Sequence, residues 1–364
     1  MPELYKETEM NITITKVREL KPKPADESKL GFGQIFTDHM FNMDYNPAKG
    51  WHNPRIEPYK PFEMDPATMV LHYGQAIFEG LKAYRTEKGN IQLFRPKENI
   101  HRSNSSSRLL CIPEIDERFA LDALKQLITV EKDWVPGAPG TSLYIRPTII
   151  ATDVFLGVKA SDTYRFFIIL SPVGAYYPEG FNPVKIWVTT RHVRAVRGGL
   201  GEAKTPGNYA ASLYAGQQAH KKGYTQVLWL DGVEQRYVEE VGAMNIFFVI
   251  DGEVITPALN GSILPGITRN SVIALAKLWN IPCTERRVAI QEIIDAQKEG
   301  RKVEIFGSGT AAVISPVGTV RFGDEEVTIG DNKVGPLTER FYKELTDIQY
   351  GRAEDPMGWT EPVL

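Results

Sequence analysis

The chain has 364 residues, a formal net charge of -3 and an apolar fraction of 42%, all ordinary for a folded protein. This length exceeds what one hydrophobic core usually serves, so we expect two packed domains. The near-neutral charge excludes a field that would recruit nucleic acid or an anionic membrane surface. Small molecules and other copies of the chain are therefore the expected partners.

The cysteines and the N-terminal residues bear on the cellular compartment. Cys111 and Cys283 lie far apart without CxxC spacing, which suits a reducing cytoplasm and predicts no disulfide framework. The N-terminal stretch lacks the apolar core of a signal peptide. No apolar run approaches the roughly 18 residues that a membrane helix needs. The sequence therefore predicts a cytoplasmic protein that is not a membrane protein.

In the first half of the chain, strand-like and helical segments follow a polar arm that ends near residue 30. Aromatic and β-branched residues between turn formers predict strands from Phe36 to Tyr84, with a helical start near Tyr73–Leu81. Apolar spacing predicts an amphipathic helix over Phe119–Trp134. The remaining expected elements are a helical segment that follows Pro96 and Asn99 and runs through Leu110, and strands at Ser142–Ile150 and Tyr164–Ser171.

The segment Ser171–Pro183 is dense in Pro, Gly and aromatic residues, and it is the expected connection between two domains. We place these domains at residues 1–173 and 185–364, with residues 174–184 between them. The second domain is expected to contain strands at Val184–Thr190, Gln226–Leu230 and Val303–Phe306, helices at Ala210–Lys222, Arg269–Trp279 and Gln291–Lys298, and a hairpin of Ile246–Ile250 with Glu253–Ile255. This mixed order predicts an α/β (α+β) fold.

Three glycine-rich segments are candidates for phosphate binding. Gly198–Thr205 resembles a nucleotide P-loop, but Ala203 stands where that motif needs a glycine. Gly307–Ala312 matches the dinucleotide pattern G-x-G-x-x-A, yet the β-branched residues after it predict extended chain instead of the required helix. Leu264–Arg269 precedes a helix with Thr268 as its expected N-cap, so backbone amides there would face an anion. This helix start and the GSGT turn together predict a phosphate site.

Lys204 and two neighbouring glutamates suggest what such a site would serve. Glycines precede Lys204 and small residues follow it, which leaves room for a bulky planar group beside the amine. Glu239 and Glu240 lie in a strand-like run, where alternation would send one inward and one to solvent. A buried carboxylate needs a partner, and a protonated pyridine nitrogen or an arginine would serve. The six histidines lack metal-ligand spacing, so no metal is expected.

Several ordered motifs identify a family. They are Lys204–Tyr209, Glu240–Asn245, Leu264–Arg269, Gly307–Thr310, Phe36–Met40, Phe78–Lys82, Tyr144–Pro147, Ser171–Tyr176 and Leu345–Arg352. Together they closely resemble the branched-chain amino-acid aminotransferases, which are fold-type IV enzymes that use pyridoxal 5'-phosphate. The resemblance spans nearly the whole chain. It implies a small N-terminal α/β domain, a larger C-terminal pseudo-barrel domain and a homodimer.

The resemblance also implies a reaction and the residues that serve the cofactor. L-Leu, L-Ile or L-Val would react with 2-oxoglutarate to give the branched 2-oxo acid and L-glutamate, in a ping-pong sequence. Lys204 would form the internal aldimine and carry the proton of the 1,3-shift. Glu240 would contact the pyridine nitrogen and Tyr209 the phenolic oxygen. The phosphate would be held by Arg102 as a bidentate donor, with Ile267, Thr268 and Thr310.

For the substrate, the resemblance implies an apolar pocket that is shared with the neighbouring subunit. Its walls would be Phe32, Tyr73, Phe78, Tyr144, Val158 and Tyr176. The Ala311 amide and the Tyr144 hydroxyl would hold the α-carboxylate, and Arg146 would take the distal carboxylate of glutamate. The redox CxxC of animal relatives is here Ala312 and Ser315, so no thiol switch is expected. Ala243 replaces a hydroxyl residue of those relatives, which leaves the preference among Leu, Ile and Val open.

Three alternatives remain beside this interpretation. A D-amino-acid aminotransferase has the same fold, but that group is shorter and lacks the aromatic set around Tyr73 and Tyr144. A fold-type IV lyase, such as aminodeoxychorismate lyase, would need a pocket for a cyclic acid. A non-enzymatic paralogue is disfavoured because Lys204, Tyr209 and Glu240 are all present.

Overall fold

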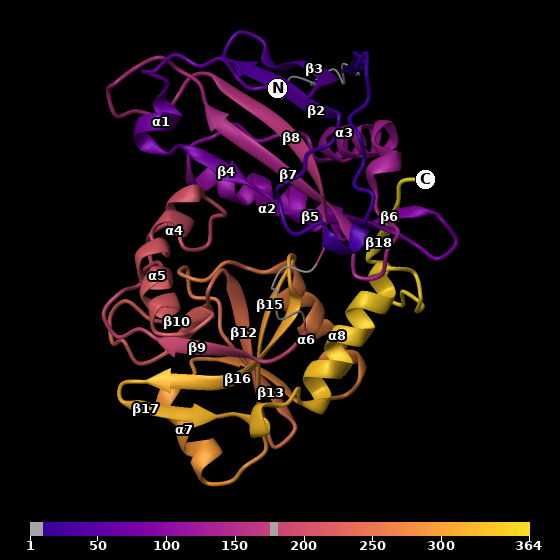
Figure 1. The fold of residues 1–364 in the computed structure, drawn as a ribbon. Coiled ribbons are helices and arrows are strands. Elements are labelled where there is room, and N and C mark those ends of the chain that lie inside the picture. The colour runs from indigo at the N-terminus through magenta and orange to yellow at the C-terminus, as the bar shows by residue number, and fades with distance from the viewer. Residues whose placement is uncertain (1–9, 175–180) are drawn as a thin grey trace, which may run out of the picture.

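The computed structural model describes residues 10–174 and 181–364, and within them the strands form two nine-stranded sheets (Figure 1). The first sheet has the order β1-β3-β2-β8-β7-β5-β6-β18, with β4 paired to β7. Its strands are β1 (Thr13–Ile14), β2 (His39–Asn46), β3 (Gly50–Pro58), β4 (Ala76–Phe78), β5 (Leu81–Arg85), β6 (Ile91–Phe94), β7 (Ser142–Ala151), β8 (Tyr164–Val173) and β18 (Thr360–Pro362). The described pairings are antiparallel except for β1 with β3.

Helical segments accompany the first sheet, and some of them contribute apolar side chains to its core. The segments are η1 (Glu27–Lys29), α1 (Met69–Tyr73), α2 (Pro96–Leu109), α3 (Glu117–Val130) and η2 (Lys132–Trp134). Helix α3 begins where the Asp116 carboxylate accepts the N–H of Phe119, at 2.7 Å. Its buried Leu124, Leu127 and Ile128 belong to the apolar core of the first sheet. Each such buried side chain stabilises the fold by about 1.5–3 kcal/mol.

The second sheet curls into a barrel-like ring. It has the order β11-β10-β9-β16-β15-β12-β13-β14, and an additional β11–β12 pairing closes the ring, while β17 pairs with β16. Its strands are β9 (Val184–Val188), β10 (Gln226–Leu230), β11 (Val238–Val241), β12 (Met244–Ile250), β13 (Glu253–Pro257), β14 (Cys283–Arg286), β15 (Val303–Gly309), β16 (Val313–Phe322) and β17 (Glu325–Thr328). The helices are α4 (Pro206–Ala210), α5 (Leu213–Lys221), α6 (Ile267–Leu278), α7 (Ile290–Lys298), η3 (Gly330–Asn332) and α8 (Pro336–Gln349).

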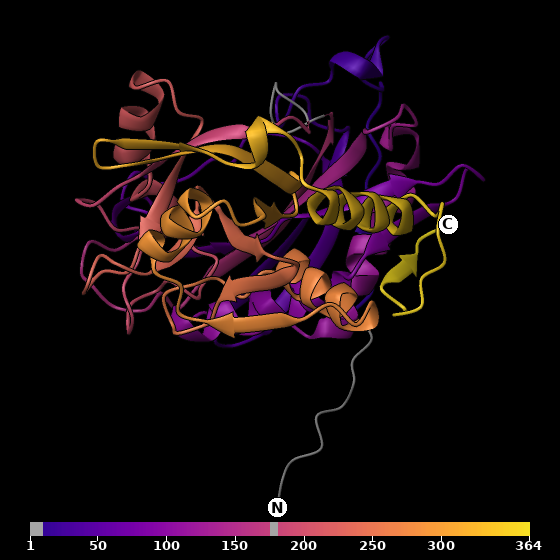
Figure 2. The same cartoon turned by 90° about the horizontal axis from the view of Figure 1, so that it is seen from below.

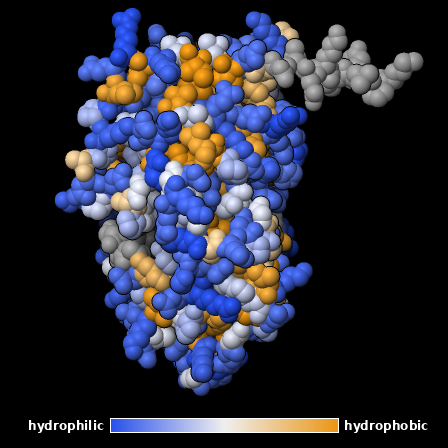
Figure 3. All heavy atoms as spheres, turned by 90° about the vertical axis from the view of Figure 1, so that its right-hand side faces the viewer, coloured by the Kyte–Doolittle hydropathy of each residue, from blue (hydrophilic) through white to orange (hydrophobic). Residues whose placement is uncertain are grey.

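The C-terminal segment ties the two sheets together. Helix α8 runs along one side of the molecule, and the chain then returns to pair β18 with β6 (Figures 1 and 2). An apolar cluster joins Tyr84 and Phe94 of the first sheet to Phe306 of the second and Phe341 of α8. The two-domain α/β organisation is thus confirmed, while the exact domain limits stay a prediction. No helix in the described ranges is long and apolar enough to cross a membrane. On the face in Figure 3, apolar side chains gather in separate patches divided by hydrophilic ones.

Most expected elements are present, and the departures have local causes. The hairpin is confirmed, with Asp251 and Gly252 at φ of 50° and 91°, the left-handed conformations that a type I′ turn needs. The helix expected near Tyr73–Leu81 is wrong: α1 ends at Tyr73 because Gly74 adopts φ 63°, and residues 76–78 form β4. The helix expected over Ala210–Lys222 corresponds to α5, and the separate short helix α4 precedes it. The N-cap of α6 is Gly266, so the assignment of Thr268 as N-cap is wrong.

Candidate active site

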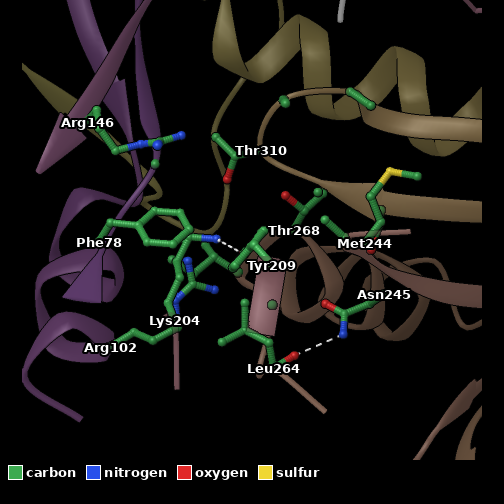
Figure 4. A pocket seen from close by; sticks show the side chains of 18 of the residues that line it. Phe78, Arg102, Arg146, Lys204, Tyr209, Met244, Asn245, Leu264, Thr268 and Thr310 are labelled. Carbon is green, nitrogen blue, oxygen red and sulfur yellow. Dashed lines mark hydrogen bonds between the residues drawn. The ribbon is translucent and has the colours of Figure 1, made fainter. Parts of the chain in front are cut away.

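A cavity of about 510 Å³ lies between residues contributed by both domains (Figure 4). Most of the predicted site residues line it. They are Phe32, Phe78, Arg102, Tyr144, Arg146, Lys204, Tyr209, Glu240, Ala243, Ile267, Thr268, Thr310 and Ala311. Residues far apart in the sequence therefore meet in one place, as the ordered motifs required.

Backbone contacts on each side of Lys204 fix its position. Its N–H donates to the Ser106 hydroxyl at 2.9 Å, and its carbonyl accepts the N–H of Phe78 at 3.0 Å. Thr205, the N-cap residue of α4, donates its hydroxyl to the Ala76 carbonyl at 2.9 Å. The Nζ of Lys204 donates to the Tyr209 hydroxyl at 2.8 Å, as the dashed line in Figure 4 shows. The amine is thus presented to the cavity by a loop that is anchored to the other domain.

Glu240 provides a buried carboxylate in the same cavity. Arg194 Nε donates to its Oε2 at 2.6 Å, and the N–H of Leu264 donates to Oε1 at 3.0 Å. Burial raises the pKa of Glu240 to about 6, and the Arg194 charge opposes that rise. An arginine was one of the two partners that the sequence left open. A carboxylate has about four acceptor positions, so this pairing leaves capacity for a further donor.

The expectation that one of Glu239 and Glu240 faces solvent is wrong, because both side chains are buried. Glu239 accepts hydrogen bonds from the Ser262 hydroxyl and, at 3.2 Å, from the Asn260 amide. The loop that follows β13 contains these donors and covers the face of β11 that the pattern assigned to solvent. Because both faces of this strand are covered, the sequence pattern alone does not indicate which of the two adjacent glutamates faces the site.

Arg102 and Glu79 form a second buried ion pair at the cavity wall. Nε and Nη2 of Arg102 donate to the two carboxylate oxygens of Glu79 at 2.8 and 2.9 Å, and Nη1 donates to the Pro265 carbonyl at 3.1 Å. Burial acts to raise the pKa of Glu79, but the Arg102 charge outweighs it and the pKa lies below its usual value. Glu79 occupies the Nε–Nη2 edge of the guanidinium, and the Pro265 carbonyl accepts from Nη1. An anion would therefore meet the Nη1–Nη2 edge.

Two backbone features add donors near this cation. Ile267 and Thr268 occupy the first turn of α6, where N–H groups have no partner inside the helix. Gly266 is required before them, since a Cβ there would lie 1.9 Å from Asn245 Oδ1. Thr310 and Ala311 lie in the turn between β15 and β16, and Thr310 points toward the cavity in Figure 4. These groups can hold an anion.

An aromatic wall carries one cation. Phe32 packs edge-on against Tyr144 with ring centroids 4.9 Å apart, and Phe78 packs against Tyr209 at 4.8 Å. The Arg146 guanidinium lies 4.7 Å from the Phe78 ring centroid, and its Nη2 donates to the Tyr144 hydroxyl at 3.0 Å. Within the described residues it has no carboxylate partner, and its buried Nε has no acceptor. The wall is therefore apolar with one cation available to a ligand.

Two predicted substrate residues do not line this cavity. Tyr73 and Val158 are 41% and 85% exposed, and the Tyr73 hydroxyl donates to the Leu156 carbonyl. Tyr176 lies outside the described residues. Tyr73 and Val158 therefore do not complete the pocket within this chain.

Three charged side chains at or behind the cavity were not predicted from the sequence. Glu79 and Lys82 belong to the Phe78–Lys82 motif that carries part of the family resemblance, and this motif was the signal that could have identified them. Arg194 lies in an arginine-containing loop with no local signal, and only the fold brings it to Glu240. The described residues contain no cluster of His, Cys, Asp or Glu that could hold a metal ion.

Comparison with known proteins agrees with this geometry. Residues 76–320 match the family Amino-transferase class IV, and the chain belongs to this family of aminotransferases. Within it, the chain is 58% identical to branched-chain-amino-acid aminotransferase 2 of Bacillus subtilis, over 98% of both chains. It is 56% identical to branched-chain-amino-acid transaminase 1 of the same organism, over 94% of this chain and 96% of the relative.

Solved structures give the same result for the fold. The branched-chain amino acid aminotransferase from Escherichia coli superimposes with a TM-score of 0.73 at 28% identity, covering 90% of this chain and 99% of that one. The branched-chain aminotransferase from the thermophilic archaeon Thermoproteus uzoniensis, solved with norvaline, gives a TM-score of 0.74 at 25% identity, covering 90% and 100%. The fold-type IV architecture expected from the motifs is confirmed.

Proposed function

We propose that this chain is a branched-chain amino-acid aminotransferase that uses pyridoxal 5'-phosphate. It would transfer the amino group of L-Leu, L-Ile or L-Val to 2-oxoglutarate in a ping-pong reaction. The observation that carries the proposal is the meeting of Lys204, Glu240 and the Arg102 anion site in one cavity with an aromatic wall. The names of the relatives, at up to 58% identity over 98% of this chain, support the substrate class.

The donor set fits each polar part of the cofactor. Arg102, the α6 amides and the Thr310 hydroxyl would hold the phosphate, and Ser308 Oγ is a buried group nearby without a partner in the described chain. Glu240 would accept the N–H of the ring, and Tyr209 would contact the phenolic oxygen. Lys204 would hold the aldehyde carbon. When bound, the cofactor supplies an electron sink for the charge that develops at the substrate Cα.

The side chains around the cofactor position would then control protons. The Nζ of Lys204 would take the proton from the substrate Cα and deliver it to the cofactor carbon that carried the aldehyde. The Tyr209 hydroxyl keeps this amine oriented through their 2.8 Å hydrogen bond. With a pKa of about 6, Glu240 is mostly ionised at neutral pH and can keep a proton on the ring nitrogen. Arg194 prevents the carboxylate from turning away.

The wall residues explain how one pocket would accept two kinds of side chain. Phe32, Phe78 and Tyr144 offer apolar surface for a branched aliphatic group. Arg146 has no carboxylate partner within the described chain, so it would pair with the distal carboxylate of glutamate. The Tyr144 hydroxyl and the Ala311 amide would hold the α-carboxylate that both substrates share.

We propose that a homodimer completes the pocket. Residues 154–158 lie beside helix α1. The Phe155 N–H donates at 3.1 Å to the carbonyl of Ala67, which precedes the helix, and the Tyr73 hydroxyl donates to the Leu156 carbonyl. The helix and this segment expose a group of apolar side chains, namely Leu71, Tyr73, Val154, Phe155, Leu156 and Val158. Such a patch favours a protein contact. Val158→Asp should shift the sedimentation coefficient from dimer to monomer, whereas a monomeric parent protein would contradict the proposal.

We also propose the cytoplasm as the compartment of this enzyme. Both cysteines are free within the described structure. Unpaired thiols of this kind suit a reducing environment. Fractionation of cells that express the full chain would test the assignment, and recovery of the protein outside the cytoplasm would refute it.

A spectroscopic experiment tests the proposed function. The protein purified with pyridoxal 5'-phosphate should absorb in the visible range, and L-leucine should remove this absorption, which a 2-oxo acid should then restore. Lys204→Ala should abolish the response while leaving the circular dichroism spectrum unchanged. Removal of the absorption by D-alanine but not by L-leucine would favour the D-amino-acid alternative and overturn the proposal.

A further inference from the structure

Lys82 is a buried lysine that joins the two domains behind the candidate site. It lies on β5, directly opposite Tyr144 of β7, and its side chain is buried. Its Nζ donates to the carbonyl of Ala311, in the turn between β15 and β16, at 2.8 Å. No carboxylate pairs with this amine among the described residues. A buried amine without a counter-ion is costly to the fold, so a structural tie alone would be better made by a neutral group.

The turn that Lys82 contacts has a strained end. Gly309 of β15 pairs with Val313 of β16, so Thr310, Ala311 and Ala312 form the connection. Val313 has φ 62°, a left-handed conformation in which a β-branched residue is an outlier. Such backbone strain persists only where the surroundings hold it. The buried amine of Lys82 is one of the groups that hold this turn.

The direction of the hydrogen bond determines what the turn offers to the cavity. In a trans peptide the carbonyl oxygen and the following N–H point in opposite directions. Lys82 borders a separate small cavity behind the turn, with Thr310 and Gln349, whereas Ala311 and Ala312 line the main one. When Lys82 holds the Ala311 carbonyl to the rear, the Ala312 N–H is directed forward. Within the described chain the Ala312 N–H has no acceptor of its own.

We infer that Lys82 is a positioning residue, which holds the Thr310–Ala312 turn so that its N–H groups face the α-carboxylate of the substrate. The inference rests on the proposed function, because that function places an amino-acid carboxylate at this turn. Consecutive N–H groups that converge in a turn form a good anion site. The amine acts through the peptide and does not touch the substrate. Gln349, whose Oε1 is buried without a partner in the described residues, borders the same rear cavity as the amine.

The test compares ligands with and without a carboxylate on the cofactor-loaded enzyme. Lys82→Met keeps the length of the side chain and removes the donor. The dissociation constant of 4-methylvaleric acid, a carboxylate without an amine, should rise at least tenfold in a titration of the visible absorption. The single-turnover rate with 3-methylbutylamine, an amine without a carboxylate, should stay within twofold of the parent rate. The KM for L-leucine should rise in parallel with the first value.

Controls separate positioning from a loss of folding. Lys88→Met replaces an exposed lysine in the turn after β5 and should change none of these values. Lys82→Gln and Lys82→Arg keep a donor and should recover part of the carboxylate affinity, and they carry the test if the Met variant does not fold. Equal changes for the acid and the amine, or no change for either, would overturn the inference. Binding of the acid needs no turnover, so an inactive parent enzyme would refute the proposed function separately.

Discussion

Gly80→Ala should disable the carboxylate-binding side of the pocket by a steric effect on one hydroxyl. A Cβ at position 80 would lie 2.1 Å from the Tyr144 hydroxyl oxygen and 3.0 Å from its Cζ. An ordinary carbon–oxygen contact is about 3.3 Å, so the hydroxyl would have to move by about 1.2 Å. The Arg146 Nη2 to Tyr144 hydroxyl distance is 3.0 Å, and this shift would break the bond. Gly80 does not have a positive φ, so the backbone itself accepts alanine.

The expected magnitude follows from the hydrogen bond that the displaced Tyr144 hydroxyl would no longer donate to the α-carboxylate of the substrate. A hydrogen bond to a charged group contributes about 1.5–3 kcal/mol, which corresponds to a reduction of about 10- to 150-fold in kcat/KM for L-leucine. Steady-state kinetics would measure it. Gly216→Ala is the matched control, because a Cβ at Gly216 meets nothing within 4 Å, and it should leave kcat/KM unchanged.

A double-mutant cycle isolates the hydroxyl. In a Tyr144→Phe background the 2.1 Å overlap is gone and only the 3.0 Å contact remains, so Gly80→Ala should then cost about threefold or less. The result that refutes the reasoning is full additivity. If Gly80→Ala reduces kcat/KM as strongly in the Tyr144→Phe background as in the parent enzyme, the substitution acts through another contact, such as the Glu79–Arg102 pair.

Three further predictions concern two charged side chains and the response to oxidation. Arg146→Gln should raise the KM for L-glutamate at least tenfold and that for L-leucine threefold or less, and equal losses would remove its assigned role. Burial raises the pKa of Glu240 to about 6, so cofactor affinity should fall as the pH decreases through 6 and the carboxylate takes up a proton. Glu240→Gln should remove this pH dependence in a fluorescence titration of cofactor binding. An unchanged pH dependence in that variant would contradict the assignment. Because Ala312 and Ser315 replace a CxxC, mild peroxide should not reduce activity; inactivation that dithiothreitol reverses would show a thiol switch.

The sequence predicted those elements that depend on neighbouring residues. Helix α3 follows from its apolar spacing, and the β12–β13 hairpin follows from Asp251-Gly252, whose left-handed conformations fit the turn. The pairing of β18 with β6 has no such local signal, because it depends on the return of α8 to the first sheet. The ring of the second sheet likewise depends on the β11–β12 pairing, which periodicity alone does not specify.

The candidate site shows the same division. The glycine-rich approach to Lys204 and the GSGT turn are local patterns, and the family resemblance joined them into one site. Arg194 was missed because it lies in the loop between β9 and α4, whereas Glu240 lies on β11, which comes later in the chain after two helices and β10. Lys82 was missed because its partner, the Ala311 carbonyl, lies 229 positions further along the chain. Contacts between residues this far apart in the chain produce no regular spacing in the sequence that could be recognised.

The two buried arginine–glutamate pairs determine the electrostatic character of the cavity. Arg102 is neutralised by Glu79 and Arg194 by Glu240, at distances of 2.8 and 2.6 Å. Loss of one partner from such a pair costs about 3–5 kcal/mol, since a buried charge is left alone. Both arginines are therefore held in place before any ligand binds. The basic side chains at or behind the cavity that have no carboxylate partner in the described chain are then Lys204, Arg146 and Lys82. A substrate with two carboxylates is the kind of ligand that such an excess of positive charge attracts.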